Sequence, residues 1–243
     1  MIVHRAAHSQ HSPAQAEPDV RQQPEVTVLA MQHLHMKNYN YLVRDTDTSD
    51  AVIIDPAWEI DKIDRAIVAT NSRLREILLT HAHSDHVHLA REVSERYDCP
   101  IRMSKEEIAS SGYDAPRLRP IDGPWAVGKM RIEPILTPGH TPGCICYVIG
   151  ANLFTGDVLF AEGCGICPND QAAYAMYDSL SELKHRIDPS TAVYPGHSYG
   201  DPPGQKMERL LKQNIYLQFR TPESFVAFRM RSGQSMTKIF DFR

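Results

Sequence analysis

The sequence lacks any apolar run that approaches the roughly 20 residues of a membrane-spanning helix. Its N-terminal stretch also lacks the apolar segment of a secretory signal. Cysteine is scarce: four of the five cysteines form the close pairs Cys144/Cys146 and Cys164/Cys167, too few and too clustered for a secreted fold held by disulfides. These absences predict a cytoplasmic protein that does not bind a membrane.

Positive charge is not in excess, because 26 Lys and Arg residues are outnumbered by 30 Asp and Glu residues and the formal net charge is -4. A chain with this balance is not an electrostatic binder of nucleic acid, so no nucleic-acid partner is expected. Hydrophobic residues make up 42% of the chain, which is enough for a sizeable core and excludes a wholly disordered protein. Histidine, by contrast, occurs 12 times, so its positions matter.

The chain divides into three segments by composition and pattern. Residues 1–24 are rich in Gln, Ser, Pro and His and are expected to form a disordered leader. Residues 25–219 are expected to form a single folded domain, and residues 220–243 a short C-terminal appendage.

Within the domain, β-branched and apolar runs bounded by turn residues predict strands over residues 26–31, 39–44, 51–55, 74–80, 101–103, 125–128, 130–137, 144–150, 152–156 and 191–196. Helical spacing predicts helices over residues 59–70, 87–97, 172–187 and 203–219. A further helix begins after Ser104, with Glu107 three residues on as in a capping box. Strands followed by alternating helices and strands occur twice, which favours an α/β fold of the αββα sandwich type over a doubly wound parallel sheet.

Four metal-competent side chains directly follow the predicted strand over residues 74–80. They lie within six residues in the sequence THAHSDH, namely His81, His83, Asp85 and His86. In an extended segment, His81 and His83 point to the same side, and Asp85 and His86 lie where the chain turns into the next helix. So many ligand types at this spacing indicate a metal site rather than a polar loop.

Three more candidates lie near the ends of later strands. His140 occurs in TPGHTPG, Asp157 follows Gly156 in FTGDVLF, and His197 occurs in YPGHSYG. Each residue alone is weak evidence for a metal site, because His and Asp residues at strand ends often only cap loops. Together the three are strong evidence, since loops at one edge of two stacked sheets can supply all the ligands of one cleft.

With these residues in place, the chain resembles the metallo-β-lactamase-fold superfamily over about residues 26–219. THAHSDH matches its HxHxDH signature, and His140, Asp157 and His197 match the later ligand positions. The segment KNYNYLVRD, with Asn38 and Tyr41, resembles the opening strand of the glyoxalase II-like branch. The ending, with Glu208, Asn214, Tyr216 and Leu217, resembles the Glu…Asn-Pro-Tyr-Leu of that branch, with Ile215 in place of Pro.

The resemblance implies two metal ions and divides their ligands. His81, His83 and His140 would hold the first metal; Asp85, His86 and His197 would hold the second; and Asp157 would bridge them. Imidazole and carboxylate ligands suit two Zn²⁺ ions, and also Fe or Mn. Two such cations lower the pKa of a shared water towards about 7, so that a metal-bound hydroxide can attack a carbonyl carbon.

The resemblance also assigns roles to individual carboxylates. Asp85 and Asp157 are assigned to catalysis as well as to metal binding. Asp55 matches a position that supports a ligand histidine, although a turn before Pro56 would favour Asp there too.

The substrate expectation rests on three other segments. The EGCGIC loop, the MYDSL helix and the FVAFRMR ending resemble most the stand-alone zinc hydrolases associated with trans-acyltransferase polyketide synthases. That resemblance implies cleavage of an acyl thioester, with an acyl carrier protein as the expected partner. Glyoxalase II itself is an alternative, but its glutathione-contacting residues have no match in the loop after Asp157.

A charge asymmetry fits a carrier partner. Residues 204–243 hold eight basic and three acidic residues, a net charge of +5 on an otherwise acidic chain. Such an end, with Arg229 and Arg231, is expected to dock an acidic carrier protein or a phosphate, although a solvated helix face is the plainer interpretation.

Two further alternatives concern the chemistry. A persulfide dioxygenase has the same fold but holds one iron with two histidines and an aspartate, and the complete second ligand set favours hydrolysis over it. Cys164 and Cys167 form a CxxC motif that suits a redox or structural zinc site, but small buried cysteines are the favoured interpretation.

Overall fold

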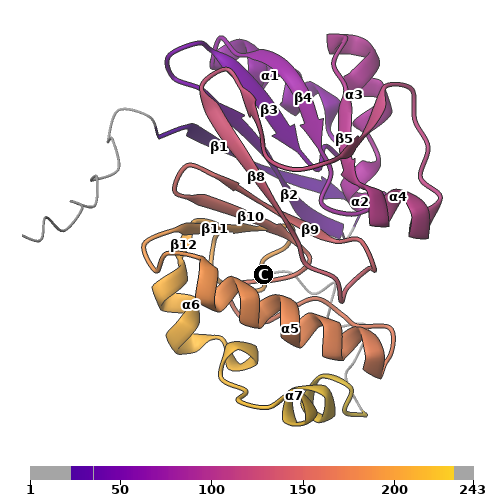
Figure 1. The fold of residues 1–243 in the computed structure, drawn as a ribbon. Coiled ribbons are helices and arrows are strands. Elements are labelled where there is room, and N and C mark those ends of the chain that lie inside the picture. Colours follow the sequence, from indigo (N-terminus) through magenta and orange to yellow (C-terminus); the bar gives the residue numbers. More distant parts are fainter. Residues whose placement is uncertain (1–22, 35, 233–243) are drawn as a thin grey trace, which may run out of the picture.

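The computed structural model describes residues 23–34 and 36–232. Its strands form two six-stranded sheets that pack face to face, and helices cover both outer faces (Figure 1). The predicted αββα sandwich is therefore confirmed. Nearly all of the predicted leader, residues 1–22, lies outside the described residues, and so do residues 233–243.

The first sheet comes from the N-terminal half of the chain. Its strands, in spatial order, are β1 (Glu25–His33), β2 (Met36–Arg44), β3 (Asp50–Ile54), β4 (Arg73–Leu78), β5 (Ile101–Ser104) and β6 (Leu118–Ile121). The first three strands are antiparallel, and the pairs from β3 to β6 are parallel. Its outer face is covered by α1 (Ile60–Ala69), α3 (Ala90–Tyr97) and α4 (Lys105–Ser111) (Figure 1).

The second sheet comes from the C-terminal half. Its spatial order is β12 (Gln205–Lys206), β11 (Ala192–Pro195), β10 (Asn152–Gly156), β9 (Ile145–Ile149), β8 (Met130–Leu136) and β7 (Trp125–Val127). Only β10 and β11 pair in parallel. The outer face of this sheet is covered by α5 (Asp170–Arg186) and α6 (Met207–Gln213), and α7 (Pro222–Arg229) packs on the far side of α5 (Figure 1).

Strand alternation divides the core into layers. On β3, Val52 and Ile54 face the core between the two sheets, whereas Ala51 and Ile53 face the core under the helices. The same period of two places Tyr147 of β9 between the sheets. This pattern is expected for strands that are buried on both faces, and it makes both sheets rigid supports for the loops at their edge.

Two predicted helices are wrong in extent. The helix predicted over residues 87–97 is two elements, α2 (Ser84–Val87) and α3, because the chain turns at His88 and Leu89. The helix predicted over residues 203–219 is β12, α6 and a 3₁₀ turn at Ile215–Leu217. It is interrupted at Asn214, whose backbone is extended and whose side chain binds the Phe160 and Gly163 carbonyl oxygens (3.0 and 2.9 Å).

Two further strands were not predicted as such, and the C-terminal appendage, expected to be helical or extended, contains a helix. Strand β6 precedes the predicted strand region, and β12 follows the strand that was predicted to be the last. Helix α7 lies in the predicted appendage and packs on α5, with Phe225 fully buried beside Tyr177 (ring centroids 5.6 Å apart). Among the described residues, no helix is both long and apolar enough to cross a membrane.

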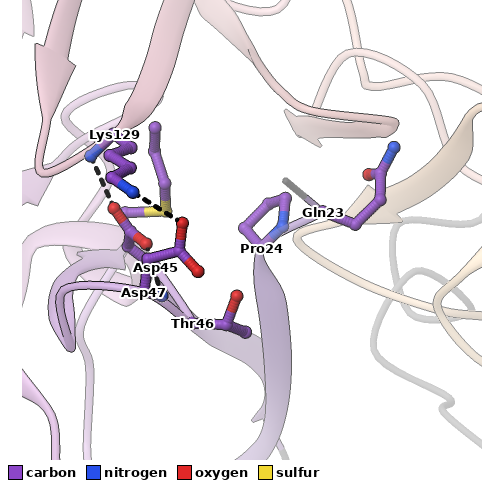
Figure 2. A pocket seen from close by; sticks show the side chains of 7 residues that line it. Gln23, Pro24, Asp45, Thr46, Asp47 and Lys129 are labelled. Carbon is purple, nitrogen blue, oxygen red and sulfur yellow. Dashed lines mark hydrogen bonds and ion pairs between the residues drawn. The ribbon is translucent and has the colours of Figure 1, made fainter. Parts of the chain in front are cut away.

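The turn after β2 is tied to the opposite sheet through Asp45. Its Oδ1 accepts the Asp47 N–H (2.8 Å) and its Oδ2 accepts the Lys129 N–H (2.5 Å), while the Lys129 ammonium pairs with Asp47 (2.9 Å; Figure 2). Gly128 fits beside this carboxylate only because it has no side chain, since a Cβ there would lie 2.5 Å from Asp45 Oδ2. These bonds join the sheets at the end where β2 leaves the core.

Candidate metal centre

All seven candidate ligands come from segments near strand ends at one edge of the sandwich. The stretch from His81 to His86 follows β4, because the Thr80 N–H donates to Asp55 Oδ1 (2.8 Å) and the chain leaves the ladder there. Helix α2 then carries Asp85 and His86. Of the other three, His140 lies between β8 and β9, Asp157 directly after β10, and His197 just after β11.

Backbone hydrogen bonds hold the two sheets together beside this edge. The Ile145 N–H of β9 donates to the Thr80 carbonyl oxygen (3.0 Å), and the Tyr39 N–H of β2 donates to the Gly196 carbonyl oxygen (2.9 Å). Gly196 is required by space, because a Cβ there would lie 2.6 Å from Asp157 Oδ1. The loops from both sheets therefore meet closely enough to share ions.

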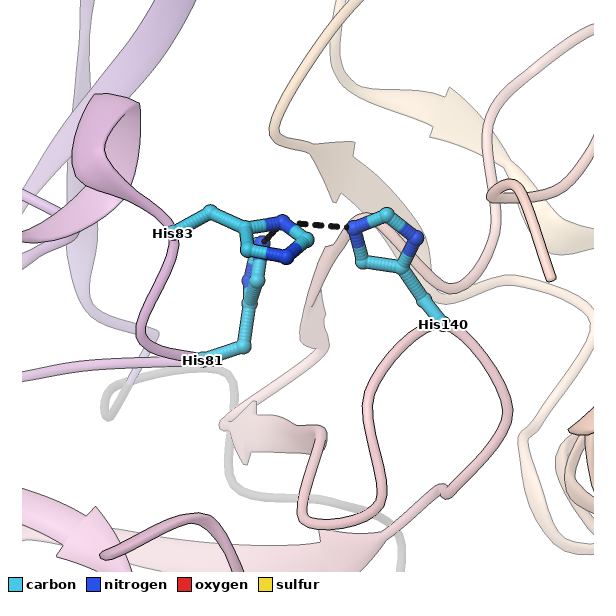
Figure 3. A group of neighbouring side chains, drawn as sticks. All are labelled: His81, His83 and His140. Carbon is cyan, nitrogen blue, oxygen red and sulfur yellow. Dashed lines mark hydrogen bonds between the residues drawn. The ribbon is translucent and has the colours of Figure 1, made fainter. Parts of the chain in front are cut away.

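Three histidines form the first group, defined as His81, His83 and His140. Figure 3 shows their three rings gathered together, and the ring centroids lie 4.6–5.0 Å apart. His83 Nδ1 lies 3.0 Å from His81 Nε2 and 3.0 Å from His140 Nε2. Three imidazole nitrogens converge on one point, which is the arrangement of a three-histidine metal site.

The second group is defined as Asp85, His86 and His197. Asp85 Oδ2 lies 3.2 Å from His197 Nε2 and 3.7 Å from His86 Nε2. Here, too, every ligand atom faces a common point.

Asp157 lies between the two groups. Its Oδ2 is 3.5 Å from His140 Nε2 of the first group, and its Oδ1 is 3.4 Å from His86 Nε2 and 3.5 Å from His197 Nε2 of the second. The structure therefore brings together all seven residues predicted from the sequence.

Hydrogen bonds on the far sides of the rings select the tautomers. His140 Nδ1 lies 2.8 Å from the Ile166 carbonyl oxygen, and His197 Nδ1 lies 2.7 Å from the Lys37 carbonyl oxygen. A carbonyl only accepts, so each Nδ1 carries a proton and each Nε2 is left as the nitrogen that would bind a cation at the centre. Metal-binding histidines are commonly oriented in this way.

Asp55 orients two further rings, as the resemblance implies. It is buried; its Oδ2 accepts from His86 Nδ1 (2.9 Å) and from the Thr80 hydroxyl (2.6 Å). Because Thr80 Oγ1 donates its proton to Asp55, it is free to accept from His81 Nδ1, 3.1 Å away. One carboxylate thus supports a ring of each group.

Burial and charge set the protonation states. Burial by itself would raise the pKa of Asp157, but the charges of His197 and His86 hold it well below its ordinary value. Burial lowers the pKa of His81 well below its ordinary value. Burial would also lower the pKa of His86, but the carboxylates of Asp157 and Asp55 raise this pKa well above its ordinary value. Asp157 is therefore ionised, and a cation would displace a proton from His86.

The residues fit metal ions. Among the described residues, the buried His86 Nε2 and Asp157 Oδ1 have no hydrogen-bond partner, and both face into the centre. Leaving such atoms unsatisfied is costly, whereas a cation bound between them would satisfy both. The donors are imidazole nitrogens and carboxylate oxygens, which are ligands of Zn²⁺ and of Fe and Mn.

Glu107 supports the site, although the sequence pattern predicted that its side chain would cap a helix. The Ser104 hydroxyl accepts the Glu107 N–H (3.0 Å), as the cap predicts. The Glu107 side chain, however, accepts from Ala82 N and Thr141 Oγ1 in the ligand loops (2.8 and 2.5 Å) instead of closing a capping box. A cap and a long-range contact look alike in the sequence, so no signal there distinguishes them.

Asn38 also contributes more than the sequence indicated. It is buried at the start of β2, and its Nδ2 donates to the Asp85 carbonyl oxygen (2.6 Å). The resemblance identified Asn38 as part of a family motif but assigned it no contact. Its place beside the second group accounts for the motif.

The cysteines do not form a further metal or disulfide site. All five are buried and free. Burial raises the pKa of every one of these thiols, including that of Cys99 to about 11 and that of Cys146 to about 12. The prediction of small buried cysteines is confirmed.

The basic C-terminal segment is less available than expected. Arg229 is 8% exposed, and its guanidinium lies 5.7 Å over the Tyr216 ring and donates to the Tyr216 hydroxyl (3.1 Å). The expectation that Arg229 docks a carrier is therefore wrong, because the side chain is part of the α7 packing. Lys238 and Arg243 lie outside the described residues.

Comparisons with known proteins agree with this geometry. A probable polyketide biosynthesis zinc-dependent hydrolase, BaeB from Bacillus velezensis, is 45% identical over 86% of this chain and 95% of its own length. A second, PksB from Bacillus subtilis, is 39% identical over 85% of this chain and 92% of its own length. The crystal structure of ETHE1 from Myxococcus xanthus matches with a TM-score of 0.73 and 25% identity, covering 88% of this chain and 95% of that one.

The family model for the metallo-beta-lactamase superfamily matches residues 37–197, which run from the start of β2 to the last histidine of the second group. This range includes all seven candidate ligands. The chain belongs to the metallo-beta-lactamase superfamily.

Proposed function

We propose that the protein is a hydrolase that uses two metal ions to cleave an acyl thioester. The observation that carries the proposal is the position of Asp157, whose two oxygens face different groups at 3.4–3.5 Å. Such a carboxylate would be suited to contact a cation in each group, as in two-metal hydrolytic sites. The first group supports one cation and the second group supports the other.

Zinc is the proposed metal. The donor set suits it, and the two Bacillus relatives are named zinc-dependent hydrolases. When bound, the cations supply an activated water at neutral pH and polarise a carbonyl oxygen. No serine or cysteine nucleophile is then required, in keeping with the buried thiols.

The chain's own residues orient and receive protons. Asp157 and Asp85 are proposed to act in catalysis, and Asp85 is the more open of the two, with 21% of its side chain exposed against 12%. Burial by itself would raise the pKa of Asp85, but the hydrogen bond from His197 and the charge of His86 lower it. Asp85 is therefore kept ionised at the mouth of the site, as a metal ligand must be, and its oxygens would accept a hydrogen bond from an activated water and so orient it.

The relatives and the sequence resemblance support the proposed substrate class. Both Bacillus relatives are named for polyketide biosynthesis, and the family branch that this chain resembles implies an acyl thioester. An acyl chain held on an acyl carrier protein is the proposed substrate.

The test is elemental analysis of the purified protein together with a panel of acyl thioesters and a persulfide. About two zinc ions per chain and thioester cleavage are expected. One iron per chain with oxygen consumption on the persulfide would instead support the dioxygenase alternative. Selective cleavage of a lactoyl thioester of glutathione would support glyoxalase II.

A ligand variant sharpens this test. His83→Ala should reduce thioester cleavage by several orders of magnitude, because it removes the central nitrogen of the first group. His185→Ala is the matched control, since His185 is exposed on α5 and bonds only within its own helix in the described structure. Near-normal turnover of His83→Ala with full metal content would reject the assignment.

Carrier docking is proposed for exposed basic residues of the same segment, among them Lys206, Lys212 and Arg231. Lys206 and Lys212 are exposed at the start and end of α6. Replacing both with Ala should lower kcat/KM for a carrier-bound thioester and leave a small thioester unaffected. Equal effects on both substrates would remove the docking proposal and leave the hydrolytic one intact.

A further inference from the structure

We propose that Glu107 is a positioning residue that fixes the geometry of the first group and so sets the affinity of one of the two cations. This inference rests on the proposed two-metal function but concerns a residue that belongs to neither ligand group. Glu107 lies in the first turn of α4 and is 1% exposed.

The three histidines of the first group come from two loops, and Glu107 is bonded to both. Its Oε1 accepts the N–H of Ala82 (2.8 Å), the residue between His81 and His83. Its Oε2 accepts the hydroxyl of Thr141 (2.5 Å), the residue after His140. One side chain therefore joins segments that lie 57 residues apart in the chain at His83 and His140.

The loop after His140 is pressed against the start of α4 at two further points. The Gly143 N–H donates to Glu107 Oε2 (3.1 Å), and the Ser104 hydroxyl donates to the Gly143 carbonyl oxygen (2.6 Å). A Cβ at Gly143 would lie 2.0 Å from Glu107 N, so the loop approaches the helix as closely as its backbone allows. The position of His140 is thus set by α4 as well as by β8 and β9 on either side of its loop.

A carboxylate is required by the pattern of partners. Two of the three groups that donate to Glu107 can only donate, namely the Ala82 N–H at Oε1 and the Gly143 N–H at Oε2. The third, the Thr141 hydroxyl, also donates to Oε2. A carboxylate offers acceptors on both oxygens, whereas an amide offers one oxygen and one NH₂ group. In Glu107→Gln, one donor of a ligand loop must therefore face another donor, and that loop must shift.

The second group is held by other residues. His86 is oriented by Asp55, His197 by the Lys37 carbonyl oxygen, and the Asp85 backbone by Asn38. The effect of Glu107 is therefore expected on one cation and not on the other.

The experiment compares Glu107→Gln with Glu106→Gln in the full chain. Glu106 is its exposed neighbour in the same helical turn, so the control removes the same charge from the same helix end. Zinc affinities are measured by titration against a competing chelator. Glu107→Gln should bind one zinc about 10- to 100-fold more weakly, the usual loss when an outer contact of a metal site is removed, while the other zinc and the control keep wild-type affinity.

A second variant guards against a folding defect. Thr141→Val removes one of the three bonds and leaves the carboxylate in place, so it should weaken the same zinc by a smaller factor. A lower melting temperature of metal-free Glu107→Gln with both zinc affinities unchanged would overturn the inference, as would equal weakening of both zincs. Wild-type protein that binds no zinc would overturn it too, whereas two zincs without thioester cleavage would reject only the proposed substrate.

Discussion

Asp55 occupies an unusual backbone conformation at the end of β3. Its φ is 50°, in the left-handed region that few residues other than glycine adopt, although Asp tolerates it better than most. Such strain costs about 1–3 kcal/mol and persists only where surrounding contacts hold it. Here the contacts are those to Thr80 and His86, so the strained residue directs both carboxylate oxygens to the end of β4 and to the centre.

Asp55→Asn is expected to lower zinc affinity about 10- to 100-fold, because an amide cannot accept from all three of its donors. Asp61→Asn, on the exposed side of α1, is the control. The measurement is chelator competition on both variants. Unchanged zinc affinity in Asp55→Asn would contradict a supporting role for Asp55.

The cysteines allow a second prediction at the scale of residues. With its pKa raised to about 11, only about one Cys99 thiol in a thousand is ionised at pH 8. The thiolate is the reactive form, and all five thiols are buried. We expect almost no reaction with a disulfide reagent at pH 8 in the native protein and five thiols after denaturation. Rapid reaction of one or more native thiols would contradict this.

At the scale of elements, α7 is packed as part of the domain. The Phe225 ring is fully buried and contacts the rings of Tyr177, Tyr216 and Phe219. Thr221 caps the helix by accepting the Ser224 N–H. The composition of residues 220–243 gave little sign of this packing, and the domain limits predicted from the sequence stay a prediction.

Phe225→Ala is expected to lower the free energy of unfolding by about 3–5 kcal/mol, the usual cost of removing a buried aromatic ring. Glu223→Ala, exposed on the same helix, should change it by less than about 0.5 kcal/mol. Urea unfolding measures both. A single transition shifted in Phe225→Ala would mean that α7 unfolds with the domain, whereas an unshifted main transition would mean that it is a separate appendage.

At the scale of the whole molecule, the candidate centre lies across the sandwich. His81, His83, Asp85 and His86 follow the first sheet, whereas His140, Asp157 and His197 belong to segments of the second. Each group contains residues from both halves of the chain. Bound metal would therefore join the two sheets and add to the stability of the entire fold.

Removal of metal by a chelator should lower the melting temperature. A ligand at about 100 times its Kd stabilises the folded state by about 2.7 kcal/mol, and about 2–4 °C per kcal/mol applies to a domain of this size. We therefore expect a fall of about 5–10 °C that is reversed by added zinc. An identical melting temperature with and without zinc would contradict metal binding at this edge.

The ligand candidates were predictable because the sequence carries them as short local patterns. The stretch from His81 to His86 is contiguous, and Asp157 and His197 are each marked by a strand that ends in a glycine loop. The two sheets were predictable for a similar reason, since alternation within a strand reports burial on its two faces. The ends of helices and strands were less predictable. Asn214, for example, interrupts a helical pattern through bonds to residues more than 50 positions away.

Sequence alone thus determined which side chains could bind metal and which layers they would lie between, because ligand chemistry and strand period are properties of neighbouring residues. Only the tertiary structure decided that Arg229 is buried and that Glu107 bonds to two loops, and only the structure gave the distances from Asp157, the residue expected to bridge, to both groups. Those facts depend on distances between segments far apart in the chain, and such distances follow from packing and long-range hydrogen bonds rather than from any local pattern.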